Sequence, residues 1–342
     1  MRRRDFITLL GGAAALSICG PPTAARAEPP ARRIGILSLG SSRAHPTPLF
    51  QALQQGLRDL GWVDGKNLAI EWRFSEGSTD PLPRLAAELV TLPVDLIVAA
   101  PAAPAIAAKA ATKDAAKQTG RGAASAIPVV FVQVPDPVGL AVVPNLGRPG
   151  ANITGLSSIA SDLSGKRLAL VKEVLPVASR IALLWNRPSP GAALVVQEMS
   201  RVQGEVGLEL VDIGVSDRSE LEDALAKAAA ERVAAVMVID DPVIASLQTP
   251  VVALAARHRL PLFSQYSPYV DAGGLMSYGP SLLALYRRAA TYVDRILKGA
   301  HPGDMPIEQP TVFELVINLQ TANTLGFDLA PTLVARADRV IE

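Results

Sequence analysis

The chain holds one cysteine, three histidines and few aromatic residues, and each shortage excludes a class of protein. A single cysteine, Cys19, permits no internal disulfide and no multi-cysteine metal site. The histidines show no metal-ligand spacing. Lys and Arg number 33 against 32 Asp and Glu, so nothing indicates the basic excess of a nucleic-acid binder. At 342 residues, 49% of them hydrophobic, the chain is too apolar for disorder and long enough for two domains.

Motifs for catalysis and cofactor binding are also missing. The sequence has no GxSxG nucleophile elbow, no GxxxxGK[ST] phosphate loop and no GxGxxG fingerprint. An exported hydrolase would need a nucleophile beside a base, and no such pair is evident. The adjacent Asp240 and Asp241 would serve a glycosidase only if two carboxylates flanked one bond, which the sequence does not indicate. We therefore predict a protein that is not an enzyme and that carries no cofactor and no metal.

The first 27 residues have the pattern of an export signal. Three arginines from Arg2 precede an apolar run at 6–18, and Ala25-Arg26-Ala27 supplies the small residues of a cleavage site. The order Arg-Arg-Arg-Asp-Phe-Ile resembles a twin-arginine signal. Two alternatives stay open, a retained membrane anchor and a lipoprotein cleaved before Cys19, although Ile18 is large for that position. Cleavage near Ala27 would leave a cysteine-free protein, which suits an oxidising compartment such as the periplasm.

The remaining chain alternates short apolar runs with amphipathic runs. Such alternation is typical of βαβ units with parallel sheets. We expect strands at 33–39, 68–74, 94–100, 129–134, 180–185, 208–215, 233–239, 260–264, 274–279 and 312–317. We expect helices at 50–60, 82–92, 102–112, 163–175, 194–206, 221–232, 243–258, 282–297 and 319–325. Residues 113–126 are small and polar, so we predict an exposed mobile loop, with a helical extension as the alternative for its first half.

The two series of strands and helices predict two doubly wound α/β lobes. The last strand–helix pairs follow a completed second series, which indicates that the chain crosses back between the lobes. We assign 1–27 to the signal, 32–154 with 276–308 to the first lobe, and 155–275 with 309–342 to the second. Several crossing segments between two lobes predict a hinge.

Polar residues at the ends of the predicted strands are the candidate ligand-binding residues. Ligands of α/β sheets bind at the carboxyl ends of strands. The first such turn contains Ser41, Ser42 and His45, whose backbone amides and side chains could hold a ligand, or which could form an ordinary turn.

Carboxylate and amide side chains follow three later strands. Asp136 and Asp241 each precede a proline, so each is either a helix N-cap or a ligand anchor. Asn186 ends another strand beside Trp185, and Tyr266 and Tyr278 follow or lie in later strands. Aromatic walls with a few polar groups are typical of small-molecule clefts, although each aromatic could instead pack in the core.

Several stretches resemble one family, the ABC-transporter substrate-binding proteins of the tryptophan/tyrosine-type branch. The resemblance covers the chain from about Ile34 to Glu342. It rests on the stretches at 56–62, 85–90, 136–140 and 145–155, and on three C-terminal strings, GGLMSYG at 273–279, RILKGA at 295–300 and QPTVFELVINL at 309–319.

The resemblance implies a type I periplasmic-binding-protein fold, with two α/β lobes, three crossing segments and a small-molecule ligand between the lobes. It implies capture of an amino acid, or of an aromatic or carboxylate-like compound, by a monomer that docks on an ABC permease in the inner membrane. A periplasmic component of a signalling system is the alternative. Two departures are notable: 113–126 is longer than in relatives, and 99–104 holds only Ala and Pro where relatives often carry hydroxyl or Gly residues.

Overall fold

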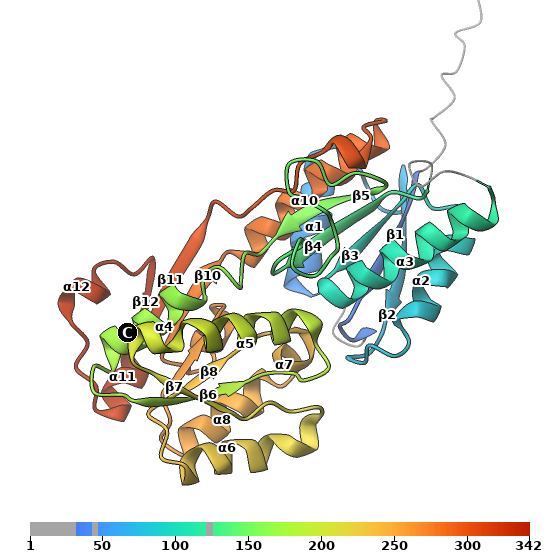
Figure 1. Ribbon diagram of the computed structural model, residues 1–342. Helices are drawn as coiled ribbons and strands as arrows, with labels where there is room; N and C mark the ends of the chain where they lie inside the picture. The colour runs from blue at the N-terminus through green and yellow to red at the C-terminus, as the bar shows by residue number, and fades with distance from the viewer. Residues whose placement is uncertain (1–31, 43–46, 121–125) are drawn as a thin grey trace, which may run out of the picture. The chain divides into compact units, whose positions relative to one another are not determined.

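A computed structural model describes residues 32–42, 47–120 and 126–342. The predicted signal at 1–27 and the candidate His45 lie outside the described residues. Residues 31–342 form one compact unit, and Figure 1 shows two α/β lobes within it. Among the helices in the described ranges, none is both long and apolar enough to cross a membrane.

The first lobe contains a five-stranded parallel sheet in the order β2-β1-β3-β4-β5. Except for the part-buried edge strand Leu68–Phe74, its strands are short apolar runs that are buried on both faces, as is typical of parallel sheets. They are β1 (Arg32–Ser38), β2 (Leu68–Phe74), β3 (Leu96–Ala100), β4 (Val129–Val134) and β5 (Ile153–Ser157). The flanking helices are α1 (Pro48–Asp59), α2 (Leu82–Thr91), α3 (Ala102–Gln118) and α10 (Leu282–Leu297).

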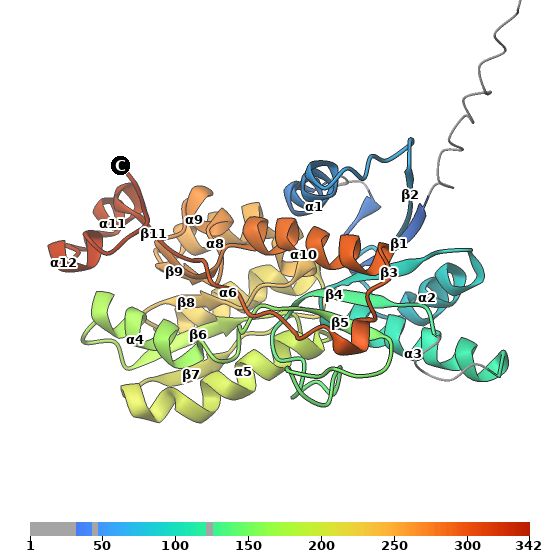
Figure 2. The ribbon, with the colours of Figure 1, turned by 90° about the horizontal axis from the view of Figure 1, so that it is seen from above.

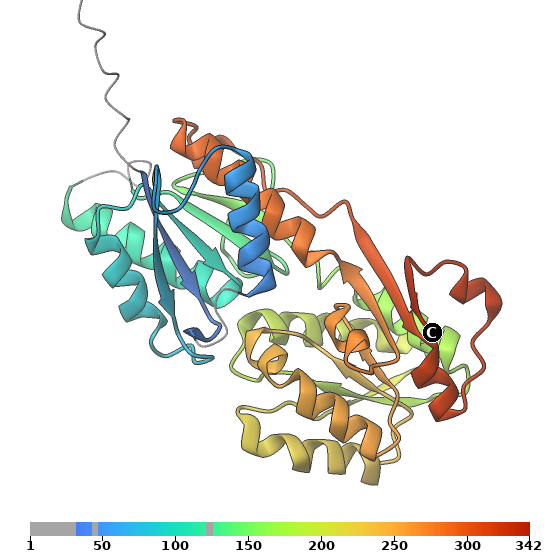
Figure 3. The same cartoon turned by 180° about the vertical axis from the view of Figure 1, so that it is seen from behind.

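In the strands other than β2, alternate side chains enter two separate cores. Ile34 and Ile36 pack with α1 and α10 on one face of the sheet, and Leu37 and Ile97 pack with α2 and α3 on the other. Figure 3 shows α1 and α10 side by side, although more than 200 residues separate them in the sequence. Gly56 permits this approach, because a Cβ there would lie 2.6 Å from the carbonyl oxygen of Arg287.

The second lobe contains a seven-stranded sheet in the order β12-β11-β10-β9-β8-β6-β7, in which only the β10–β11 pair is antiparallel. Its strands are β6 (Arg180–Leu184), β7 (Glu209–Asp212), β8 (Val236–Val238), β9 (Leu262–Ser264), β10 (Met276–Pro280), β11 (Phe313–Asn318) and β12 (Arg339–Ile341). Its helices are α4 (Ser164–Val174), α5 (Pro190–Val202), α6 (Leu221–Ala230), α7 (Pro242–Ser246), α8 (Gln248–Arg257), α9 (Pro268–Asp271), α11 (Leu319–Leu325) and α12 (Pro331–Val334).

Three segments carry the chain between the lobes, which confirms the predicted fold class. The first joins β5 to α4, the second joins β10 to α10, and the third joins the turn at Pro302–Asp304 to β11. Figure 2 shows the third segment returning past β5, where the backbone of Glu308 forms an isolated parallel β-bridge with Leu156. The predicted first lobe began again at 276, but β10 pairs with β9 and β11 in the second sheet, so the return to the first lobe starts only after Pro280.

Some predicted boundaries were wrong for identifiable reasons. α3 continues to Gln118 rather than stopping at 112, which confirms the helical extension given as the alternative for the first half of 113–126; these last turns are rich in helix-forming residues and bury Ala116. The helix expected at 243–258 is divided into α7 and α8. Pro250 has no backbone N–H to donate to the carbonyl of Ser246, so one continuous helix cannot form there.

Candidate functional site

A small polar cavity lies between the two lobes, at the carboxyl ends of β4, β8 and β9. Its volume is about 30 Å³. Pro101, the first two residues of α3 and the start of α5 contribute apolar walls. Its polar lining comes from both sides of the hinge, namely from Gln133, Ser158, Ser189, Asp240, Asp241, Gln265 and Tyr266.

Gln133 has an unusual backbone conformation within β4. Its φ is +65°, in the left-handed region, and the register of β4 against β5 shifts between Val132 and Val134. Such a bulge re-aims a side chain at the cost of local strain. The side chain of Gln133 accepts a hydrogen bond from the Tyr286 hydroxyl at 3.1 Å, so a residue of the first sheet is fixed to α10 at the cavity wall.

Tyr266 brings the second lobe against the same wall. Its side chain is buried, and its hydroxyl lies within hydrogen-bonding reach of Ser158 and Gln133. Burial raises the pKa of Tyr266 to about 12, so the phenol stays protonated in the neutral range. The predicted candidate Tyr266 thus lines the cavity.

Asp241, Asn186 and Ser189 form one buried network at the start of α7 and α5. Asp241 Oδ1 accepts from the backbone N–H groups of Val243 and Ile244, each at 2.9 Å, as an N-cap does. Asn186 donates to Asp241 Oδ2 at 2.6 Å. Burial raises the pKa of Asp241, while these hydrogen bonds and one from Ser189 act in the opposite direction. Asp241 therefore lines the cavity as a capping residue whose two oxygens are both engaged.

Asp240 faces the cavity in a different way. It is part-buried, and its Oδ1 accepts from the Tyr269 hydroxyl at 2.8 Å. Burial in the cleft raises the pKa of Asp240 to about 7, with a further contribution from Asp241, against the opposing effect of the Tyr269 hydrogen bond. A carboxyl group with such a pKa changes charge in the physiological range, which is typical of functional sites.

Gln265 and Arg167 each carry a buried donor without a hydrogen-bond partner in the described part of the chain. Gln265 Oε1 accepts from the backbone N–H of Asp240 at 2.9 Å, while its Nε2 has no partner. Arg167, on α4, is 1% exposed. Its Nε donates to the Tyr278 carbonyl at 2.8 Å and its Nη1 to the Ala160 carbonyl at 2.6 Å, whereas its Nη2 is unpartnered.

The other predicted residues in the described ranges do not line this cavity. Ser41 Oγ and the Ser42 backbone N–H donate to Glu76, at 2.7 and 2.9 Å. Asp136 caps a turn by accepting from the N–H groups of residues 138 and 139. Tyr278 stacks on Phe313, with ring centroids 6.4 Å apart, beside a cavity of about 10 Å³ next to Arg167.

Sequence reasoning did not select Gln133, Ser158 or Gln265, and it noted Asp240 only as a neighbour of Asp241. Gln133 carried a usable signal, because it is the single polar residue of the buried run Val-Val-Phe-Val-Gln-Val. Ser158 and Gln265 are ordinary loop residues in sequence. Only the arrangement of three strand ends brings them together.

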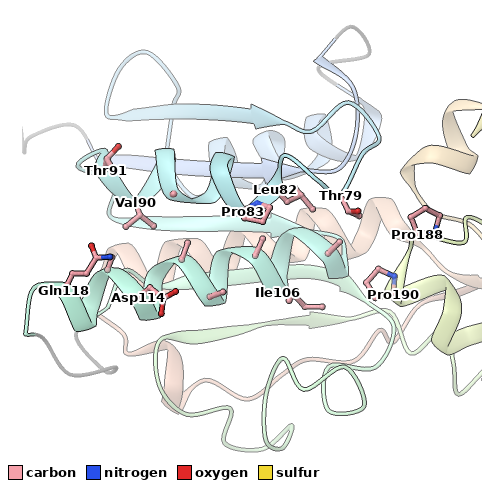
Figure 4. Close-up of a pocket in the computed structure, with 16 residues that line it drawn as sticks. Thr79, Leu82, Pro83, Val90, Thr91, Ile106, Asp114, Gln118, Pro188 and Pro190 are labelled. Atoms are coloured by element: carbon pink, nitrogen blue, oxygen red, sulfur yellow. The ribbon is translucent and has the colours of Figure 1, made fainter. Parts of the chain in front are cut away.

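A larger hollow of about 760 Å³ runs between α2 and α3 in the first lobe (Figure 4). Small and apolar side chains of both helices line most of it, and Pro188 and Pro190 lie at one end. The charged lining is a single carboxylate, Asp114, near the other end. Recognition of a small ligand needs several convergent polar groups, so the inter-lobe cavity is the better candidate despite its smaller volume.

Comparison with known proteins gives a consistent result. A family model described as ABC transporter substrate binding protein matches residues 45–341. The chain is 27% identical over 292 residues to a "Tyrosine-binding protein" of Clostridioides difficile, which covers 84% of this chain and 80% of that protein.

Solved structures agree with this match. A conserved domain protein from Vibrio cholerae superimposes with a TM-score of 0.81 at 26% identity, covering 90% of this chain and 99% of the other. An ABC domain from Streptococcus pneumoniae, solved in complex with L-Trp, gives a TM-score of 0.80 at 26% identity, covering 91% and 100%.

Proposed function

Because the chain belongs to the family of ABC transporter substrate-binding proteins, we propose that it is the solute receptor of an ABC importer. It captures a small molecule in the inter-lobe cleft, closes about the hinge and delivers the ligand to a permease in the inner membrane. Members of this family bind small ligands without transforming them, so the protein is not an enzyme.

The observation that carries the proposal is the cavity whose polar lining comes from both lobes. Gln133 reaches it from the first sheet, whereas Asp240 and Gln265 reach it from the second. A ligand held by all three would join the lobes, and ligand-biased closure follows from such differential contacts. A cavity of about 30 Å³ is far smaller than the roughly 300–1,000 Å³ of typical ligand sites, so entry requires the lobes to separate.

An amino acid or related compound is the ligand class that we propose. Two relatives support it, one called a tyrosine-binding protein and one solved with L-Trp. The first residues of α3 and α5 also line the cavity. The N-terminal ends of these helices carry partial positive charge, which suits a ligand carboxylate.

Export to the periplasm completes the proposal. Family members typically work outside the cytoplasm, and the basic start, apolar run and Ala25-Arg26-Ala27 of this chain suit a cleaved signal. Mass spectrometry of the protein recovered from periplasm is expected to find a new N-terminus at Glu28. An N-terminus at Met1, or a lipid on Cys19, would contradict a soluble periplasmic form.

A thermal-shift screen of the purified protein tests the receptor role. The panel holds the standard amino acids together with aromatic acids and small carboxylates. A ligand present at 100 times its Kd is expected to add about 2.7 kcal/mol to the free energy of unfolding. The ligand should be recovered unchanged after incubation. Absence of stabilisation by every compound would contradict an amino-acid or carboxylate receptor.

A further inference from the structure

We infer that Asp240 is the residue that selects the ligand, by binding an ammonium group in the closed cleft, with Gln265 donating to an acceptor atom beside it. This inference rests on the proposed receptor function and names the group that the site reads. It also replaces Asp241, the neighbouring carboxylate that the sequence analysis gave as a candidate ligand anchor.

The hydrogen bonds of the two carboxylates distinguish them. Both oxygens of Asp241 are engaged within the protein, by two backbone N–H groups at the start of α7 and by Asn186. Asp240 accepts from Tyr269 on Oδ1 alone, and no described residue donates to its Oδ2. Because Asp240 is part-buried and lines the cavity, this oxygen is available to a ligand.

Gln265 places a donor next to that acceptor. The backbone N–H of Asp240 donates to Gln265 Oε1 at 2.9 Å, which fixes the orientation of the amide. Its Nε2 is then left buried on the cavity lining without a partner. An unsatisfied buried donor is unfavourable, and a ligand acceptor would remove that cost. The pair therefore suits a ligand with a cationic donor near a hydrogen-bond acceptor.

The charges around Asp240 favour a cation. Asp241 adds a second carboxylate, and the titratable groups packed around both are the phenols of Tyr266, Tyr269 and Tyr286. Burial raises the pKa of each phenol, so all three stay neutral below pH 9. No Lys or Arg of the described ranges lines this cavity. The guanidinium of Arg167 interacts with Tyr266 but does not line the cavity, and it donates to main-chain carbonyls.

Proton release on binding follows from this arrangement. Burial raises the pKa of Asp240 to about 7, so below pH 7 the carboxyl is largely protonated and must lose its proton to pair with an ammonium ion. The affinity for an ammonium ligand should therefore rise with pH. Affinity at pH 8 is expected to exceed that at pH 6 by about tenfold, the ratio of the ionised fractions of a group with this pKa.

Three matched triads of compounds test the inference in wild-type protein, by thermal shift and calorimetry at pH 6 and pH 8. Each triad holds an amino acid, its decarboxylated amine and its deaminated acid: L-tyrosine, tyramine and 3-(4-hydroxyphenyl)propionate; L-tryptophan, tryptamine and indole-3-propionate; L-leucine, isoamylamine and 4-methylpentanoate. In at least one triad the two members with an ammonium group are expected to bind, with the pH dependence above, while the acid is not.

Two variants assign the effect to Asp240. D240N is expected to lose tenfold to a hundredfold in affinity for the ammonium compounds, and to lose the pH dependence. D328N, which removes an exposed carboxylate of the same lobe, is the matched control and should behave as wild type.

The outcomes separate the inference from the receptor role. Binding of a deaminated acid in preference to its ammonium partners, or wild-type affinity and pH dependence in D240N, would overturn the role of Asp240 and leave the receptor function standing. Binding of none of the nine compounds by the wild-type protein would overturn the role of Asp240, whereas the receptor function fails only if the wider thermal-shift panel also yields no ligand.

Discussion

Replacing Arg167 with methionine tests what joins two of the crossing segments. The buried guanidinium of Arg167 donates to the Ala160 carbonyl, in the segment between β5 and α4, and to the Tyr278 carbonyl, two residues before β10 ends. Methionine has similar length without charge or donors. The substitution therefore removes this connection while keeping much of the side-chain volume.

Two opposing effects set the size of the change. Hydrogen bonds to a charged donor contribute about 1.5–3 kcal/mol each, so losing two removes about 3–6 kcal/mol. Burial of the guanidinium works the other way, because desolvation lowers the pKa of Arg167 to about 10, which corresponds to about 3 kcal/mol against the charged form. We expect R167M to lose about 2 kcal/mol in the free energy of unfolding, and its Tm to fall by roughly 3–6 °C.

Urea and thermal denaturation of three proteins decide the case. R167K keeps the buried charge, but its single ammonium group cannot reproduce the fork that reaches both carbonyls. It should therefore be at least as destabilised as R167M. If R167M were as stable as wild type, or more stable, desolvation would outweigh the two hydrogen bonds, and Arg167 could not be considered a stabilising connection between the crossing segments.

Three further predictions concern the walls of the cleft. A Cβ at Gly279 would lie 2.1 Å from the Gln265 carbonyl oxygen. G279A is therefore expected to displace the loop of Gln265 and to weaken ligand affinity at least tenfold, as measured by calorimetry. Wild-type affinity in G279A would contradict the close approach. At Gln133, where φ is +65°, Q133V should be less stable than Q133N by about 1–2 kcal/mol, because a β-branched residue is disfavoured there; equal urea midpoints would argue against strain. Because the folded-state pKa of Asp240 is raised to about 7, the ligand-free protein should lose stability as the pH rises from 4 to 7. Thermal melts over that range should show a smaller loss in D240N, and an equal loss in D240N would exclude Asp240 as the cause.

The sequence was sufficient for the layers of the fold. Apolar runs such as 129–134 predict buried strands, and amphipathic runs such as 282–297 predict helices. Gly or Pro separates such runs, so the local pattern agrees with the final structure. The strand at Ile153–Ser157 was not predicted, because Thr, Gly and Ser interrupt its apolar pattern. Its backbone is buried against β4, and that tertiary pairing cannot be read from local pattern.

The site was less predictable because its chemistry depends on which hydrogen bonds the fold satisfies. Asp240 and Asp241 are adjacent in sequence and both acidic, so composition gives no reason to separate them. The helix that starts at Pro242 uses the carboxylate of Asp241 as its cap, and Asp240 is left facing the cavity. Gln265 could not be predicted for the same reason. Its Oε1 accepts from the backbone N–H of Asp240, and its Nε2 has no hydrogen-bond partner among the described residues.

Several strained or unsatisfied groups lie at the cleft, and their position bears on how closure is controlled. Gln265 carries an unpaired donor, Asp240 resists ionisation, and Gln133 is held at a positive φ. The unpaired donor and the carboxyl group that resists ionisation each raise the free energy of this arrangement when no ligand is bound. A ligand that supplies an acceptor and a cation would relieve both costs, but not the backbone strain at Gln133. A ligand shifts an equilibrium only by its differential affinity for the two states, so we expect these groups to make closure depend on the ligand. A fully satisfied apolar cleft would close equally well without one.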